Sequence, residues 1–236
     1  MRRWVRIVGT VMIVLGALTL VWAVVVWQWQ DPFTALYTKW RQHQLVHQYE
    51  RRVQSFRPAP IVTNSLAAER RSIARAAYRY RVDSKQGEAI GRIRVPRMGV
   101  NMIVVNGTDE SSLQKGPGRD LRTYMPGENR LIYIAGHRTT YLAPFSHIDR
   151  MKPGDRITLE VPYGTFIYTA THHRIVKSTD LSVLKSPRHE LLELQACHPR
   201  FFASHRYIVY ARLTRVEPRG AAAYDVSTLA AQASGK

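Results

Sequence analysis

The single cysteine of the chain, Cys197, could supply a nucleophilic thiol. It closes the apolar run LLELQAC and is followed by His198 and Pro199. Because a proline cannot continue a paired strand, we expect Cys197 to lie at a strand end, on the rim of a sheet. The plain alternative is a buried cysteine that serves only as a small hydrophobic side chain. A lone thiol cannot form a disulfide within the chain, which favours the chemical role.

Two further side chains could complete a thiol site. His137 directly follows the apolar run LIYIAG, and Arg206 begins the run RYIVYARL nine residues after Cys197. If the strands on either side of residues 198–205 pair as a hairpin, Cys197 and Arg206 become neighbours. An imidazole carries a proton and a guanidinium stays charged, so the three groups could act as nucleophile, proton carrier and oxyanion partner. The plain alternative for Arg206 is a surface salt bridge.

Short strands would have to position these residues. After Lys85 the sequence alternates short apolar runs with glycine and proline, which predicts an antiparallel β-barrel or sandwich. The runs are AIGRIRV, NMIVVNG, LIYIAGHR, DRITLEVP, GTFIYTATHHRIVK, LLELQAC and YIVYARLTR. Short helical insertions are expected near Ser111–Gly116 and Phe145–Met151. The segment from Arg219 onward is rich in alanine, serine and glycine and is predicted to be a disordered tail.

Two helices are expected before the strands. Residues 30–57 are polar, aromatic and basic, which is typical of a helical stalk, and Pro58 and Pro60 would end it. The run LAAERRSIARAAYRYR then has a helical composition, with Ser65 as a candidate N-cap. The apolar spacing in this run predicts one shared face, formed by Leu66, Ile73, Ala77 and Tyr80.

An apolar segment near the N-terminus is long enough to cross a membrane. Residues from Ile7 to Trp27 carry no charge, and this length of helix rises roughly 30 Å. A cleaved signal peptide is the alternative, but the apolar run exceeds a signal h-region and no clear cleavage site follows. Arg2, Arg3 and Arg6 precede the span, so the positive-inside rule predicts a cytoplasmic N-terminus and an extracellular remainder.

The formal net charge of +18 raises the question of nucleic-acid binding. The arginines are scattered through the chain, however, and no nucleic-acid motif is present. A basic domain beside an anionic cell envelope accounts for the charge more simply, so no nucleic-acid partner is expected.

Four segments together resemble the sortases, which are membrane-anchored cysteine transpeptidases of Gram-positive bacteria. They are KGPGR at 115–119, PGENRLIYIAGHRTTYLAPF at 126–145, MKPGD at 151–155 and LLELQACHPRFFASHRYIVYARL at 191–213. The resemblance covers residues 86–216, and the GHRTTY and CHPR stretches look most similar to the class E sortases of actinobacteria. It implies an all-β fold, a closed sortase-type barrel with short helical insertions. The expected division is a cytoplasmic tail and transmembrane helix at 1–28, a helical stalk at 29–84, the barrel at 85–218 and the tail at 219–236.

The resemblance also assigns roles to particular residues. The family's catalytic residues fall on His137, Cys197 and Arg206, and the residues suggested for substrate binding are Ala196, Thr139 and Tyr141. The family usually carries a TLxTC pattern that ends at the nucleophile, whereas here Glu193 and Ala196 stand at its two threonine positions. This departure bears on fine specificity more than on the type of reaction. No metal site and no cofactor are expected.

The implied reaction is cleavage of an LAxTG-like or LPxTG-like sorting signal between threonine and glycine, through a thioacyl intermediate on Cys197. An amine of a cell-wall precursor or of a pilin would then take the threonine. The expected partners are surface proteins with a C-terminal sorting signal, these amine acceptors, and the plasma membrane through one N-terminal helix. Two alternatives stay open. The first is a thiol hydrolase or L,D-transpeptidase that acts on cell-wall peptides, and the second is an inactive surface adhesin or scaffold with a sortase-like barrel.

Overall fold

Eight strands form the barrel that carries the candidate catalytic residues. The computed structural model of the chain describes residues 2–29, 32–57, 61 and 65–226. These strands are β1 (Ala89–Val95), β2 (Val100–Asn106), β3 (Gly118–Arg119), β4 (Leu131–Ala135), β5 (Arg156–Val161), β6 (Gly164–Lys177), β7 (Leu191–His198) and β8 (His205–Pro218), and a ninth strand, β9 (Tyr224–Asp225), pairs with β8 outside the barrel. All of the apolar runs singled out in the sequence form strands, and β3 and β9 are short additions.

The sheet closes on itself. The strands follow the order β6-β5-β1-β2-β3-β4-β7-β8, and β8 also pairs with β6. The predicted closed β-barrel is therefore confirmed. Two pairs, β2–β3 and β4–β7, are parallel, so the antiparallel expectation is wrong for them. No tight turn joins β4 to β7, because β5 and β6 lie between them in the chain, and so no hairpin imposes an antiparallel direction.

The alternation of side chains along β7 separates the barrel interior from the candidate site. Leu192, Leu194 and Ala196 are fully buried in the barrel core. Cys197 is one residue out of phase with this set and is only partly buried. It therefore projects from the opposite face of the sheet.

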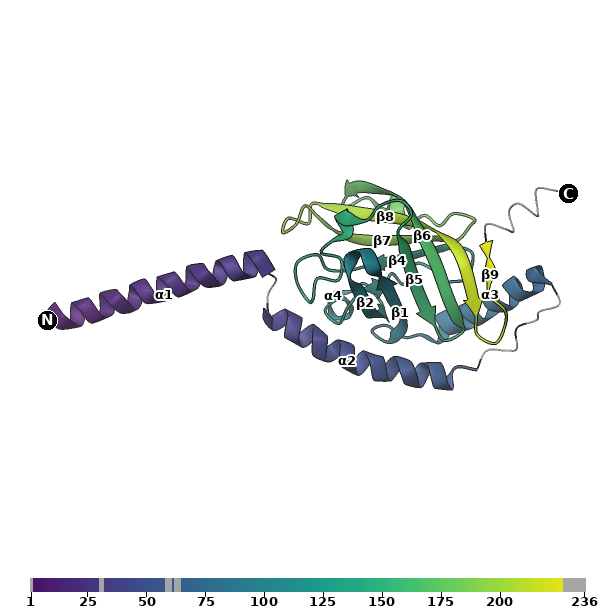
Figure 1. The fold of residues 1–236 in the computed structure, drawn as a ribbon, viewed down its shortest axis with the longest axis horizontal. Coiled ribbons are helices and arrows are strands. Elements are labelled where there is room, and N and C mark those ends of the chain that lie inside the picture. Colours follow the sequence, from purple (N-terminus) through teal and green to yellow (C-terminus); the bar gives the residue numbers. More distant parts are fainter. Residues whose placement is uncertain (1, 30–31, 58–60, 62–64, 227–236) are drawn as a thin grey trace.

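The helices precede the barrel or interrupt its strands. They are α1 (Arg2–Trp29), α2 (Pro32–Ser55), α3 (Leu66–Asp83) and α4 (Glu110–Leu113), with short 3₁₀ turns η1 (Pro96–Met98), η2 (Ile148–Arg150) and η3 (Leu181–Leu184). Helix α1 extends away from the barrel, whereas α2 runs along it beside β1 and β2 (Figure 1). Among the described residues, Arg2–Val25 is the one stretch of helix with the length and mean hydropathy, 2.4, to span a membrane.

Helix α2 packs closely on the barrel. Leu45 and Tyr49 are buried against Ala89, Ile103 and Val105, in a small core of their own. Burial of two large side chains stabilises this contact by several kcal/mol, at roughly 1.5–3 kcal/mol for each fully buried side chain. The predicted helical stalk is thus a helix that shares a hydrophobic contact with the barrel.

A glutamine of α2 completes the backbone hydrogen bonding of β2. Gln42 donates from Nε2 to the carbonyl oxygens of Ile103, at 3.0 Å, and Lys115, at 2.7 Å. Its Oε1 accepts from the Ile103 amide at 2.7 Å. Strand β3 pairs only with Val105 and Asn106 of β2, so Gln42 serves the part of β2 that β3 leaves open.

Helix α3 contributes most of its predicted apolar face to the main core, but Leu66, at its start, is only partly buried and is not part of that core. The side chain of Ser65 accepts a hydrogen bond from the Ala68 amide, which confirms the N-cap. Ile73, Ala77 and Tyr80 are buried in the barrel core.

Part of the predicted disordered tail is ordered. Strand β9 pairs with Arg215 and Val216 of β8, and Tyr224 packs against the core. The ring of Tyr224 gives this segment a hydrophobic contact that the alanine-rich composition did not suggest. Residues 227–236 of the tail lie outside the described residues.

Candidate active site

Cys197 and Arg206 face each other across a strand pair. The antiparallel register of β7 and β8 matches Cys197 with Arg206 directly. The loop between the strands therefore forms the hairpin that the sequence predicts, and the two side chains lie at the same rim of the barrel. The Arg206 guanidinium donates from Nη1 to the carbonyl oxygens of Ala203, at 2.6 Å, and His205, at 3.0 Å.

His137 reaches the same rim from the other side of β7. Strand β4 runs parallel to β7, with Ala135 opposite Gln195, and the Gly136 amide donates to the Gln195 carbonyl at 3.0 Å. Counting two residues onward on both strands brings His137 level with Cys197. A β carbon on Gly136 would meet the ring of Phe145 at 2.8 Å, so glycine is needed for this close approach.

One cavity of about 260 Å³ contains all three candidate catalytic residues. Its lining also draws on the segments 108–122 and 178–184. The lining residues are Thr108, Leu113, Asp120, Arg122, Tyr133, Ala135, Gly136, His137, Ser178, Asp180, Leu181, Val183, Leu184, Gln195, Cys197 and Arg206. The cavity thus combines a thiol, an imidazole and a guanidinium with an apolar wall.

The environment of His137 favours its neutral form. Burial lowers the pKa of His137 below its usual range, and the carboxylate of Glu110 opposes this shift. Nε2 of His137 is buried and has no hydrogen-bond partner among the described residues. The ring lies against Tyr141, with 5.1 Å between the ring centroids. An unpartnered ring nitrogen beside a thiol can exchange a proton with a substrate.

The loop after His137 is conformationally strained. Tyr141, Leu142 and Ala143 have φ angles of 53°, 61° and 37°, a region that side chains with a β carbon rarely occupy. The amide of Tyr141 donates to Oγ1 of Thr34, in α2, at 3.2 Å. Helix α2 thus helps to hold the loop that follows the candidate proton carrier.

Arg138 joins the ends of β4 and β7 and was not singled out in the sequence. Its side chain is 4% exposed, and Nη1 donates to the Cys197 carbonyl at 3.2 Å and to Nδ1 of His198 at 3.0 Å. Nη2 forms an ion pair with Asp149 at 3.0 Å. Burial, and then the charge of Arg138, lower the pKa of His198. Its position directly after His137 was the one feature of the sequence that could have pointed to Arg138 as part of the site.

The three residues suggested for substrate binding do not lie together: two are in the loop after His137, and the third is in the barrel core. Tyr141 lies against the ring of His137, and Thr139 is partly buried in the same loop. Ala196 is fully buried in the barrel core. The residues of β7 that line the cavity are instead Gln195 and Cys197.

Glu193, at the other departure from the TLxTC pattern, lies on the same face of β7 as Cys197. It is 3% exposed, and its Oε2 has no hydrogen-bond partner among the described residues. Burial raises the pKa of Glu193 to about 8, against an opposing effect of Arg174. The chain therefore carries a buried, titratable carboxyl at this position of β7.

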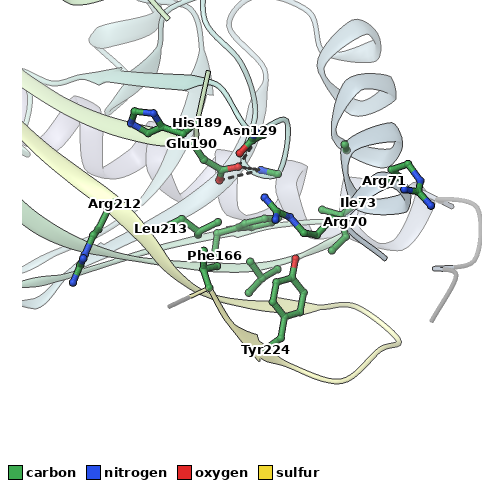
Figure 2. Close-up of a pocket in the computed structure, with 14 residues that line it drawn as sticks. Arg70, Arg71, Ile73, Asn129, Phe166, His189, Glu190, Arg212, Leu213 and Tyr224 are labelled. Carbon is green, nitrogen blue, oxygen red and sulfur yellow. Dashed lines mark hydrogen bonds between the residues drawn. The ribbon is translucent and has the colours of Figure 1, made fainter. Parts of the chain in front are cut away.

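A second, larger cavity lies at the opposite end of β7 (Figure 2). It has a volume of about 460 Å³, and its lining includes Arg70, Phe166 and Glu190 but none of the three catalytic candidates. Figure 2 shows the Glu190 carboxylate turned toward the loop that carries Asn129. It accepts hydrogen bonds from the amides of Gly127 and Asn129 and from the Tyr168 hydroxyl. These bonds give Glu190 a structural role in bracing the loop.

Comparison with known proteins matches the part of the chain that holds this site. The model of the sortase domain matches residues 93–214. Sortase D of Bacillus subtilis strain 168 is 34% identical over 131 residues, which cover 53% of this chain and 64% of that protein. The chain therefore spans less than two thirds of that relative.

Solved structures agree with the barrel. The Clostridium perfringens Sortase D5 transpeptidase has a TM-score of 0.58 at 23% identity, over 73% of this chain and 98% of that one, which supports the fold. Sortase E1 of Streptomyces coelicolor, solved with a tripeptide in its active site, has a TM-score of 0.53 at 26% identity, over 56% of this chain and 92% of that one.

Proposed function

Because the chain belongs to the sortase family, we propose that it is a cysteine transpeptidase whose nucleophile is Cys197. The family assignment confirms the resemblance seen in the sequence, and sortases D and E are both among its relatives. The observation that carries the proposal is the shared cavity, in which Cys197, His137 and Arg206 meet.

In the first half-reaction, the Cys197 thiolate attacks the carbonyl carbon of the threonine in a sorting signal. Arg206 stabilises the negative charge that develops on the carbonyl oxygen. The threonine–glycine C–N bond breaks, and protonated His137 gives its proton to the departing amine. The threonine is then held on Cys197 as a thioester.

In the second half-reaction, an incoming amine attacks the thioester carbonyl. His137 takes the proton from the amine, the C–S bond breaks, and Cys197 leaves as the thiolate. For the protons to balance over the two half-reactions, His137 must start protonated and Cys197 must start as the thiolate. Since burial lowers the pKa of His137, its protonated form is a minority at neutral pH.

We assign a sorting signal of the LAxTG or LPxTG type as the substrate class, carried by surface proteins. The acceptor is an amine of a cell-wall precursor or a pilin. The apolar walls of the cavity, including Leu181, Val183 and Leu184, support a peptide with aliphatic side chains next to the scissile bond.

The proposed location is the plasma membrane, with α1 as a single span, a cytoplasmic N-terminus and an extracellular barrel. The mean hydropathy of Arg2–Val25 and the arginines that precede the apolar run support this arrangement.

The test uses the full chain in detergent micelles, because α2 packs on the barrel and a truncation near residue 60 would remove that contact. The protein is incubated with LAxTG or LPxTG peptides and triglycine, and the products are identified by mass spectrometry. We expect a peptide–triglycine conjugate that disappears in Cys197→Ala and in His137→Ala.

Other products would change the assignment. Free peptide acid without conjugate, even at high triglycine concentration, would indicate a thiol hydrolase. The absence of any turnover or acyl-enzyme in the folded protein would favour the adhesin or scaffold alternative. Ser204→Ala, on the loop beside Arg206, is a matched control that we expect to retain conjugate formation.

A further inference from the structure

The outward face of α2 changes character along the helix. On its first half, Leu36, Tyr37 and Trp40 are 70%, 40% and 53% exposed. On its second half, the exposed positions are polar: His43, Gln44, His47, Glu50, Arg51, Gln54 and Ser55. An exposed apolar surface confined to one end of a helix marks that end as a contact site.

The side chains of Leu36, Tyr37 and Trp40 do not pack on the barrel. The opposite face of the same half-helix holds Thr38, which is fully buried and donates to the Gln114 carbonyl at 2.9 Å. One turn later, Gln42 is bound to β2. With these contacts in place, Leu36, Tyr37 and Trp40 must face away from the barrel.

The exposed face lies next to the apolar helix. Helix α1 ends at Trp29 and α2 begins at Pro32. Trp40 therefore lies only about 12 Å along α2 from its start, at a rise of roughly 1.5 Å per residue. The guanidinium of Arg41 lies over the rings of Tyr37 and Trp40, at 6.0 and 5.6 Å from their centroids. Aromatic rings with basic neighbours are typical of the boundary between lipid and water.

We propose that Leu36, Tyr37 and Trp40, named here the α2 patch, bind the headgroup region of the bilayer. Their rings and the leucine side chain would enter the interface, while Lys39 and Arg41 contact lipid phosphates. The proposal rests on the membrane anchoring by α1 given under the proposed function. Continuity with that helix selects a lipid surface as the partner, ahead of a second copy of this chain.

The α2 patch would also orient the active site. The Thr34 side chain accepts a hydrogen bond from Tyr141, in the loop that follows His137. The patch and this loop therefore belong to one packed unit. With the patch in the interface, the catalytic cavity opens close to the membrane surface, where a substrate that is itself membrane-bound would present its signal.

Site-directed fluorescence on the full chain tests the proposal. Cys197→Ala removes the native thiol, and Leu36→Cys, Trp40→Cys, Glu50→Cys and Val14→Cys are each made in that background and labelled with an environment-sensitive dye. The proteins are reconstituted in vesicles of phosphatidylethanolamine and phosphatidylglycerol. We expect iodide quenching at positions 36 and 40 to be roughly threefold or more weaker than at position 50, with strong quenching by a lipid that carries a nitroxide near its headgroup.

Three results would overturn the proposal, and each has a different meaning. Equal iodide quenching at positions 36, 40 and 50, with position 14 protected, would show that the anchor holds but the α2 patch is in water. Protection at 36 and 40 without quenching by the nitroxide lipid would indicate a protein contact, such as a second copy. Strong iodide quenching at position 14 would reject the membrane anchoring itself.

Discussion

The guanidinium of Arg138 donates a hydrogen bond to the backbone carbonyl of Cys197, at 3.2 Å. Because Arg138 follows His137 in the chain, this bond ties the residue after the proposed proton carrier to the backbone of the proposed nucleophile. The ion pair with the half-exposed Asp149 compensates part of its buried charge. A buried side chain that does not line the cavity thus connects the segment after β4 to the end of β7.

Arg138→Met is expected to lower kcat/KM by about 10²-fold, since small displacements of catalytic groups cost factors of this size. The variant should also lose about 1.5–3 kcal/mol of unfolding free energy with its charged hydrogen bonds. A small alkylating reagent needs no alignment with His137, so the rate of Cys197 alkylation should change far less than transpeptidation. Steady-state kinetics, alkylation and denaturant unfolding measure the three quantities.

Arg150→Met, a neighbouring exposed arginine, is the control and should leave all three quantities unchanged. Arg138→Lys keeps a charge for Asp149 but loses the planar fork, so we expect only partial recovery of kcat. Wild-type kcat in Arg138→Met would contradict the positioning role.

Glu110 supports the protonated form of His137. Its carboxylate opposes the lowering of the His137 pKa by burial, so Glu110→Gln should lower that pKa further. The acidic limb of the pH profile of kcat/KM reports the histidine in the free enzyme, and it should move to lower pH in the variant. At neutral pH the variant should be slower, because fewer molecules carry protonated His137. An unshifted acidic limb would show that Glu110 has no influence on this titration.

The local parts of this site could be predicted from the sequence. Cys197 and Arg206 flank one short loop, so hairpin pairing alone makes them neighbours, and the register of β7 and β8 agrees. The apolar runs marked the strands, because alternation and turn residues act over a few positions.

The non-local parts could not be predicted in this way. His137 reaches Cys197 through the parallel pairing of β4 with β7, and no local pattern specifies which distant strands pair. The contacts of Arg138 were equally unpredictable, because its partners come from β7 and η2. Gln42 could not be singled out either, because it is one of many polar residues in a polar helix. Ala196 shows a further limit, since its neighbour Cys197 faces the cavity while its own side chain fills the core.

Gln42→Ala tests the attachment of α2 to the barrel. The variant removes three hydrogen bonds and leaves the amide and carbonyl of Ile103 without this partner. We expect a loss of roughly 1–3 kcal/mol in unfolding free energy, the usual cost of unpaired buried polar groups. Gln44→Ala, on the exposed face of the same helix, should be nearly neutral. Hydrogen exchange should also speed up in β2 for Gln42→Ala, and unchanged exchange there would argue against the attachment.

Glu193 makes stability depend on pH. Its pKa is about 8 in the folded chain, above the value of about 4.3 for an exposed glutamate, so the folded state keeps a proton that the unfolded state has released. The unfolding free energy should therefore fall as pH rises from about 4.3 to about 8. Glu190, whose pKa burial raises to about 7, adds to this fall over much of the same range, so the Glu193 contribution is isolated by comparison with a Glu193 variant.

Glu193→Gln should flatten this fall above pH 7 and stabilise the protein at pH 8.5 by roughly 1–3 kcal/mol, because no buried carboxyl then has to ionise at this position. Urea unfolding at pH 5 and pH 8.5 measures the difference. A parallel decline in both proteins above pH 7 would assign the titration to another group.

Arg206 should act on the chemical step more than on substrate binding. In the resting protein its Nη1 is bound to the Ala203 and His205 carbonyls, at the rim it shares with Cys197. Stabilisation of an oxyanion is realised only in the transition state, so Arg206→Ala should lower kcat by about 10²–10³-fold with little change in KM. The kcat of Arg206→Lys should lie between those of Arg206→Ala and the wild type, since an ammonium supplies the charge but not the planar fork. Burst kinetics with a sorting-signal peptide measures acylation directly, and an acylation rate in Arg206→Ala equal to that of the wild type would rule out the oxyanion role.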